Sequence, residues 1–154
     1  MEQPQEDQFL MDMQNNETLS ILSTLFELQE ERAYAYKLLD EGHKIYLSTA
    51  PFHDFEAYQQ VVHNVTQDFK RISGSVMELE RNLREQHPPL ASLVSQLQCL
   101  EQRKLHLTAQ LQLARQNILE SSEPEAEVKS IRKEMTSVID GINDILSELK
   151  YEAE

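Results

Sequence analysis

The chain has 154 residues, of which 27 are acidic and 14 are basic, so its formal net charge is −13. So acidic a chain should be repelled by nucleic acid and by anionic membrane surfaces, because both carry dense negative charge. With 40% hydrophobic residues and only 3 glycines, the composition favours helices over sheets and one domain with its own core.

The N-terminal segment, residues 1–15, is polar and acidic and contains Pro4. Because it shows no sustained hydrophobic period, we expect a disordered acidic leader. It also lacks the basic start and apolar run of a signal peptide, so we expect a nuclear or cytoplasmic protein that is not secreted. A short apolar anchor, docking on the bundle or on a partner, is the alternative for four of its residues: Phe9, Leu10, Met11 and Met13.

Residues 16–154 are predicted to form a single helical domain of four long helices. The first helix is expected at about 17–48, with Asn16 as its N-cap and Pro51 just beyond its end. Its apolar positions lie on one helical face: Ile21, Leu25, Leu28, Ala35, Leu39 and Tyr46.

The second helix is expected at about 54–86, with Asp54 as its cap. Its apolar residues follow one another in steps of three and four, a heptad seam typical of coiled-coil packing. Gly74 lies in its middle, where we expect it to permit close approach of a neighbouring helix. The seam consists of Phe55, Tyr58, Val62, Val65, Phe69, Ile72, Val76, Leu79 and Leu83.

The third helix, at about 89–120, starts at a proline pair, and the fourth, at about 123–151, starts at a capping box of Ser122 and Glu125. Lys104 is the one polar interruption of the third seam. That seam reads Leu90, Leu93, Leu97, Leu100, Lys104, Leu107, Leu111, Ala114 and Ile118, and the fourth reads Val128, Ile131, Met135, Val138, Ile142, Ile145 and Leu149.

The connections between these helices are short, which makes neighbouring helices antiparallel. The sequence therefore predicts an all-α fold: an antiparallel four-helix bundle built from coiled-coil-like helical hairpins. In the main alternative, the second and third helices form an extended antiparallel hairpin while one or both outer helices are detached or pair between chains. Such seams also leave a homodimer open.

No pattern in the sequence is typical of catalysis. Gly42, Gly74 and Gly141 are isolated, which excludes a phosphate-binding loop. The histidines lack the i, i+4 spacing of a zinc site, and Cys99 is the only cysteine, so we expect neither metal nor cofactor. We expect Cys99 to be a small buried or boundary residue beside Leu100. The sequence thus predicts a protein that is not an enzyme.

Several pairs of basic residues have acidic neighbours, and we expect them to form ion pairs on the surface rather than a nucleic-acid site. Direct nucleic-acid binding through these stripes is therefore disfavoured, though it stays an alternative. The pairs are Lys70 with Arg71, Arg81 with Arg84, Arg103 with Lys104, and Arg132 with Lys133.

A mixed polar and aromatic stripe follows the first helix beside its apolar face. It consists of Arg32, Tyr36, Leu39, His43 and Tyr46. An arginine facing a core must find acceptors, because an unpaired buried guanidinium is very unfavourable. Either Arg32 pairs with a carboxylate inside the bundle, or Arg32, Tyr36, His43 and Tyr46 form a surface that binds a partner.

Two segments, ELQEERAYAYKLLDEGHKIYL (27–47) and DFEAYQQVVHNVTQDF (54–69), resemble the DNA-repair "required for excision 1-B" domain family. The resemblance extends over about residues 20–154. It implies a small helical protein associated with excision repair of DNA, with no catalytic residues or cofactor to carry over. It rests on Arg32, Tyr36, Leu39, Gly42, His43, Tyr46, Leu47, Phe55, Tyr58, Val62, His63, Thr66 and Phe69.

Taken with the residues, this resemblance predicts a non-enzymatic helical adaptor that acts through contacts with protein partners, including a DNA-repair assembly. The first alternative is a structural coiled-coil subunit of an oligomeric complex with no specific role in repair. The second is a weak nucleic-acid binder that uses the local basic stripes.

Overall fold

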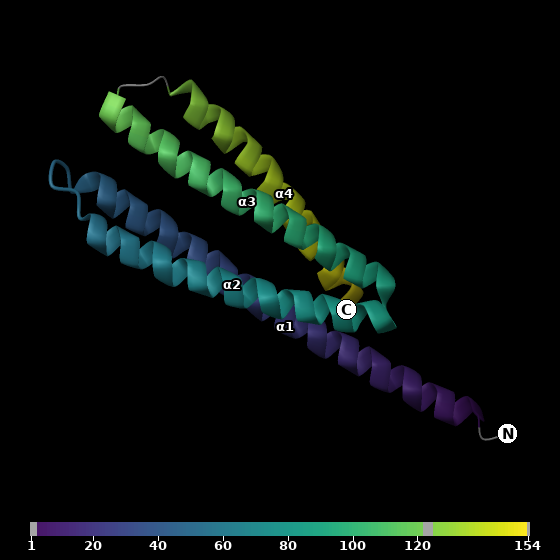
Figure 1. Cartoon of the computed structure of the whole chain (residues 1–154). Coiled ribbons are helices and arrows are strands. Elements are labelled where there is room, and N and C mark those ends of the chain that lie inside the picture. The colour runs from purple at the N-terminus through teal and green to yellow at the C-terminus, as the bar shows by residue number, and fades with distance from the viewer. Residues whose placement is uncertain (1–2, 122–124, 154) are drawn as a thin grey trace.

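The fold consists of helices and short connections, seen in a computed structural model that describes residues 3–121 and 125–153 (Figure 1). Over this part of the chain no strand is present, which confirms the predicted all-α class. None of the described helices combines the length and apolar character of a membrane-spanning segment. The helices are α1 (Gln3–Ser48), α2 (Phe55–Gln86), α3 (Pro88–Ser121) and α4 (Ala126–Ala153).

Most helix boundaries follow the local sequence. The Asp54 carboxylate accepts a hydrogen bond of 3.1 Å from the Ala57 backbone N–H, which confirms the predicted cap of α2. Helix α1 ends at Ser48, shortly before Pro51, and α3 begins at Pro88, where a missing N–H has no helical partner to lose. Ser122, in the capping box predicted for α4, lies outside the described residues.

The N-terminal boundary is where the prediction was wrong. Helix α1 begins at Gln3 rather than near residue 17, so residues 3–15 are helical instead of a disordered leader and Asn16 is not a cap. The physical reason is local. After Pro4, which the first turn tolerates, no proline or glycine interrupts the helix before Gly42, and Glu6 lies near the positive end of the helix dipole.

The helices form two antiparallel hairpins, one of α1 and α2 and one of α3 and α4. The hairpins pack together through α2 and α3, whereas α1 and α4 touch only slightly. Figure 1 shows that the hairpins converge near the α2–α3 connection and diverge toward their other connections. The predicted antiparallel arrangement is thus present, as a bundle that opens at one end.

The predicted seams form most of the core, but Phe55, the first residue predicted for the second seam, is 56% exposed at the first position of α2. Phe69, Leu97 and Ile142, one from each of the last three helices, are 8%, 0% and 4% exposed. Two apolar clusters result, of which the larger spans all four helices. The side chain of Ile118 lies outside those described. The smaller cluster joins α1 and α2 and consists of Ala35, Leu39, Val65 and Phe69.

Two predictions about small residues were wrong. A Cβ atom added at Gly74 would meet nothing within 4 Å, so no neighbour approaches there. The close approach lies instead at Gly42 of α1, where a Cβ atom would come within 2.9 Å of the Cγ1 atom of Val61 on α2. Cys99 is exposed, because the seam residues Leu97 and Leu100 turn the opposite side of α3 toward the core.

Candidate functional site

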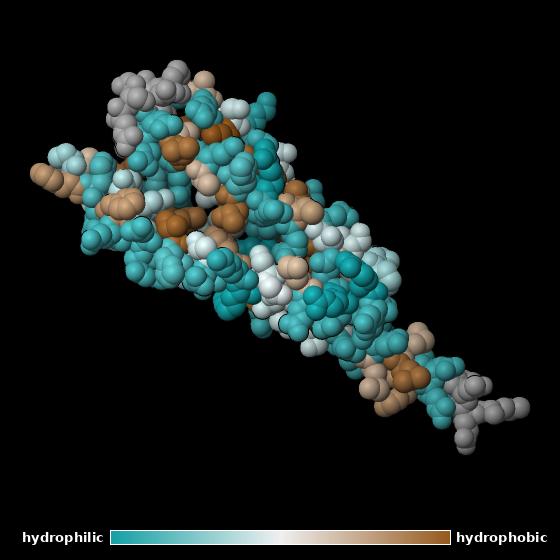
Figure 2. All heavy atoms as spheres, viewed as in Figure 1, coloured by the Kyte–Doolittle hydropathy of each residue, from teal (hydrophilic) through white to brown (hydrophobic). Residues whose placement is uncertain are grey.

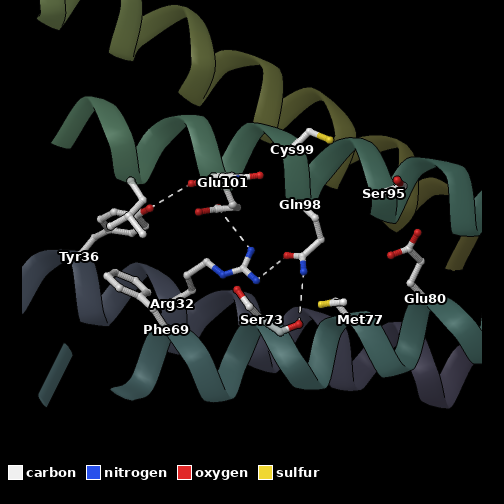
Figure 3. A pocket seen from close by; sticks show the side chains of 12 residues that line it. Arg32, Tyr36, Phe69, Ser73, Met77, Glu80, Ser95, Gln98, Cys99 and Glu101 are labelled. Atoms are coloured by element: carbon white, nitrogen blue, oxygen red, sulfur yellow. Dashed lines mark hydrogen bonds and ion pairs between the residues drawn. The ribbon is translucent and has the colours of Figure 1, made fainter. Parts of the chain in front are cut away.

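A layer of buried polar side chains joins α1 to α3 between the two apolar clusters. Arg32 is only 2% exposed, and its guanidinium donates hydrogen bonds to the amide oxygens of Gln29 and Gln98, at 3.2 Å and 2.7 Å. Glu101, 6% exposed, places its Oε1 atom 4.0 Å from the guanidinium and accepts a hydrogen bond from Gln29. Figure 3 shows Arg32 facing Gln98 and Glu101 across the helices. We call Gln29, Arg32, Gln98 and Glu101 the polar layer.

The polar layer also reaches α2. The Gln98 amide nitrogen donates a hydrogen bond of 3.3 Å to the backbone carbonyl of Ser73, shown as a dashed line in Figure 3. One glutamine of α3 therefore bonds both to Arg32 of α1 and to the backbone of α2. The second carboxylate oxygen of Glu101, Oε2, has no hydrogen-bond partner among the described residues. The contribution of the polar layer to the stability of the fold therefore depends on Arg32, the cation that compensates this buried carboxylate.

Tyr36 and Lys104 continue this arrangement along α1 and α3. The Tyr36 hydroxyl donates a hydrogen bond of 3.3 Å to the Glu101 backbone carbonyl, and the Lys104 amine lies 4.1 Å from the centre of the tyrosine ring. Burial lowers the pKa of Lys104, although Glu101 opposes the shift. A cation over an aromatic face is a favourable contact, which explains how a lysine fits in the seam of α3.

For Arg32 the structure has the first of the two predicted alternatives, because the guanidinium is buried and bonded. Burial lowers the pKa of Arg32, and the Glu101 carboxylate opposes this. His43 is buried as well, and Tyr36 and Tyr46 are half-buried. Arg32, Tyr36, His43 and Tyr46 therefore form no continuous exposed surface. Sequence reasoning did not identify Glu101 as the partner of Arg32, although it lies one turn before the conspicuous Lys104.

An aromatic cluster fills the end of the α1–α2 hairpin. The ring of Tyr46 stacks on that of Tyr58 with their centres 4.9 Å apart, and His53 lies at the same centre-to-centre distance from Tyr46. His43, 1% exposed, lies 5.5 Å from Tyr58. Neither ring nitrogen of His43 has a hydrogen-bond partner within the described part of the chain.

We expect His43 to make the stability of the fold depend on pH near neutrality. Burial lowers the pKa of His43, Arg115 of α3 lowers it further, and Asp40 opposes them. The unfolded chain then binds a proton more readily than the folded chain, so the free energy of unfolding should fall as the pH drops below about 6.5 toward the folded-state value. Urea unfolding at several pH values measures this slope. A His43→Phe variant should be flatter over the same range, and an equal slope in both proteins would contradict the assignment.

A groove runs along the junction of α2 and α3. One cavity of about 460 Å³ borders the polar layer, and a second of about 410 Å³ continues toward Tyr58 and Gln112; both are lined by Phe69, Ser73 and Leu105. The groove is bridged at its far end, since the Tyr58 hydroxyl donates a 2.6 Å hydrogen bond to Gln112. Its walls are mainly apolar, and the charged side chains Arg32, Glu80 and Glu101 line the first cavity.

The beginning of α1 projects beyond the rest of the fold. Residues 5–17 are all exposed, and we call them the N-terminal extension. Figure 2 shows hydrophobic side chains gathered on this projecting rod. Four large apolar residues are more than half exposed there: Phe9 at 64%, Leu10 at 55%, Met11 at 56% and Met13 at 53%.

Basic side chains elsewhere form ion pairs, as predicted for several of them. Arg84 pairs with Glu80 within α2, while Arg71 pairs with Glu31 of α1 at 3.0 Å. Arg103 of α3 pairs with Glu134 of α4. Across the residues that the structure describes, no three histidine, cysteine or acidic side chains are grouped so as to bind a metal ion.

Comparison with known proteins identifies relatives over most of the chain. Residues 20–115 match the family described as DNA repair REX1-B. A protein of Bos taurus, named "Required for excision 1-B domain-containing protein", is 32% identical over 153 residues, or 98% of this chain and 85% of the relative. A Mus musculus protein of the same name is 34% identical over 137 residues, 88% and 80% of the two chains. No solved structure matches.

Proposed function

The chain belongs to the DNA repair REX1-B family, and from this premise we propose that it is a non-enzymatic adaptor that acts in excision repair of DNA through contacts with protein partners. We place this activity in the nucleus, where the DNA is. The observation that carries the proposal is the N-terminal extension, whose apolar side chains are left exposed by the rest of the described fold.

The extension has the form of a helix that binds in a groove. Phe9 and Met13 are four residues apart and Leu10 and Met13 are three apart, so their side chains neighbour one another on the helix surface. An amphipathic helix that presents such anchors fits an apolar groove on another protein. Clustered exposed apolar residues of this kind are typical of interaction sites.

Charge narrows the kind of partner. The extension carries Glu6, Asp7, Asp12 and Glu17, and the chain has no lysine or arginine before Arg32. We therefore propose that the partner offers an apolar groove with a basic rim, because complementary charge favours association and orients the two proteins.

The polar layer supports a structural rather than a catalytic role for the most conspicuous polar residues. Arg32, Gln98 and Glu101 are engaged with one another across helices, and Tyr36 bonds to the backbone. Groups committed in this way are unavailable to position a substrate, so the proposal assigns binding to the extension instead.

The test is rescue of DNA-damage survival in cells that lack the protein. The test variant replaces Phe9, Leu10 and Met13 by alanine, which keeps the helical propensity of the extension. We expect this variant to fold, to fail to restore survival, and to lose a protein that co-purifies with the unaltered chain.

The matched control replaces three exposed residues of similar type on the body of the fold by alanine: Tyr34, Met77 and Leu113. We expect the control to restore survival. Full rescue by the extension variant would show that the extension is not the binding surface, and normal survival of cells without the protein would refute the repair role itself.

A further inference from the structure

A cavity lined by basic residues lies at the end of the fold where the two hairpins diverge. Its volume is about 530 Å³, and it is bordered by the end of α1, the later part of α3 and the start of α4. We call it the basic pocket. Its lining residues are Lys44, Leu47, Ser48, Arg115, Glu125, Val128, Lys129 and Arg132.

The charge of the basic pocket is opposite to that of the chain. Among the residues that the structure describes, four basic side chains and one acid, Glu125, line it, whereas the chain as a whole has 14 basic residues, 27 acidic residues and a net charge of −13. The cations come from three helices, so the fold and not a run of sequence brings them together. A concave site lined by one sign of charge attracts groups of the opposite sign.

Two of the cations are positioned by Asp40. The Lys44 amine lies 2.9 Å from one Asp40 carboxylate oxygen, and the Arg115 guanidinium donates a 3.2 Å hydrogen bond to the other. Burial alone would raise the pKa of Asp40, but the hydrogen bonds from Lys44 and Arg115 outweigh it and leave the pKa below its ordinary value. Asp40 is thus ionised and holds the Lys44 and Arg115 side chains in place.

The other two cations of the pocket lie on α4. Lys129 and Arg132 are exposed and lie three residues apart on α4, so they share a helical face. Within the described residues neither forms an ion pair. Glu125 lies four residues before Lys129 in the same pocket but forms no ion pair with it, so both cations are available to bind an anion from outside.

We propose that the basic pocket binds an acidic peptide segment of a partner protein, through carboxylate or phosphoryl groups. Leu47 and Val128 supply an apolar wall beside the cations, which suits a peptide that alternates acidic and apolar side chains. A long nucleic acid would extend beyond the pocket over a chain of net charge −13 and be repelled by it. A second copy of the chain carries the same net charge and is disfavoured for the same reason. The pocket is separate from the N-terminal extension, so this inference goes beyond the proposed adaptor function and does not depend on it.

The test measures binding of labelled synthetic peptides to the full chain by fluorescence anisotropy at low salt. Three short peptides alternate leucine with glutamate, phosphoserine or, as the uncharged comparison, glutamine. We expect the glutamate or phosphoserine peptide to bind, with affinity that falls as salt rises, and the glutamine peptide not to bind. The better of the two anionic peptides identifies the oxyanion that the pocket prefers.

The pocket variant is Lys129→Glu with Arg132→Glu, and the matched control is Lys37→Glu with Lys133→Glu, which makes the same change in net charge at exposed positions outside the pocket. We expect the pocket variant to bind at least about tenfold more weakly, because each lost charge-assisted hydrogen bond removes a sizeable share of affinity. The control should change far less.

Three outcomes would overturn the proposal. The first is that no anionic peptide binds. The second is that both variants lose affinity equally, which shows an effect of overall charge alone. The third is that single-stranded or duplex DNA binds more tightly than either peptide and depends on Lys129 and Arg132, which makes the pocket a nucleic-acid site.

Discussion

Replacing Arg32 by leucine is expected to lower the free energy of unfolding by about 3–5 kcal/mol, the range seen when one partner of a buried ion pair is removed. The change leaves the Glu101 carboxylate buried without its cation and removes a donor from Gln98. Urea unfolding followed by circular dichroism measures the loss. It should appear as a lower midpoint without a change in the slope of the transition.

The double variant Arg32→Leu with Glu101→Leu separates two explanations of that loss. If an uncompensated buried charge is the cause, removing the carboxylate as well should recover most of the stability, since apolar replacement of a whole buried pair is often neutral or favourable. If the double variant is as unstable as the two single variants summed, the charges contribute independently and the pairing described here is incorrect.

Replacing Leu22 by alanine is expected to lower the free energy of unfolding by about 2–5 kcal/mol, the usual range for emptying a well-packed leucine site. Leu22 is 0% exposed and belongs to the large apolar cluster. The same substitution at Leu10, on the same helix but 55% exposed, should change stability by no more than about 0.5 kcal/mol.

This pair of variants tests where α1 joins the core. Both substitutions exchange leucine for alanine within one helix, so helix propensity contributes equally to the two results. A large loss at Leu10 would mean that the N-terminal extension folds back onto the body. A small loss at Leu22 would mean that α1 is not packed as described.

Much of the fold is predictable from the sequence because hydrophobic period reports directly which face of a helix is buried. The seam of α2 becomes buried at Val65, Phe69, Ile72, Val76 and Leu83, all of which the spacing identified. The cap at Asp54 follows equally from local chemistry. The start of α1 does not, because its apolar residues are exposed and follow no sustained period of the kind that marks a buried helix face.

The polar contacts are a different matter, since they depend on how distant segments align. The periodicity of the first helix shows that Arg32 faces the core. It does not show that Arg32 bonds to Gln98 and pairs with Glu101 of α3. The basic pocket raises the same difficulty, because Lys44, Arg115 and Arg132 come from three helices. The same holds for the glycines, because Gly42 and Gly74 are both isolated within helices in the sequence. Only the structure shows that a neighbouring helix comes close to Gly42 and not to Gly74.

The polar layer has a consequence for how the helices find their alignment. A heptad seam of apolar residues matches itself again after a slide of seven residues, or about 10 Å of helix, so hydrophobic packing alone tolerates misaligned pairings. Arg32 and Gln98 remove that degeneracy, because a slipped helix would bury the guanidinium against leucine. The polar layer thus specifies the register in which α1, α2 and α3 pack together, as single polar residues do in coiled coils.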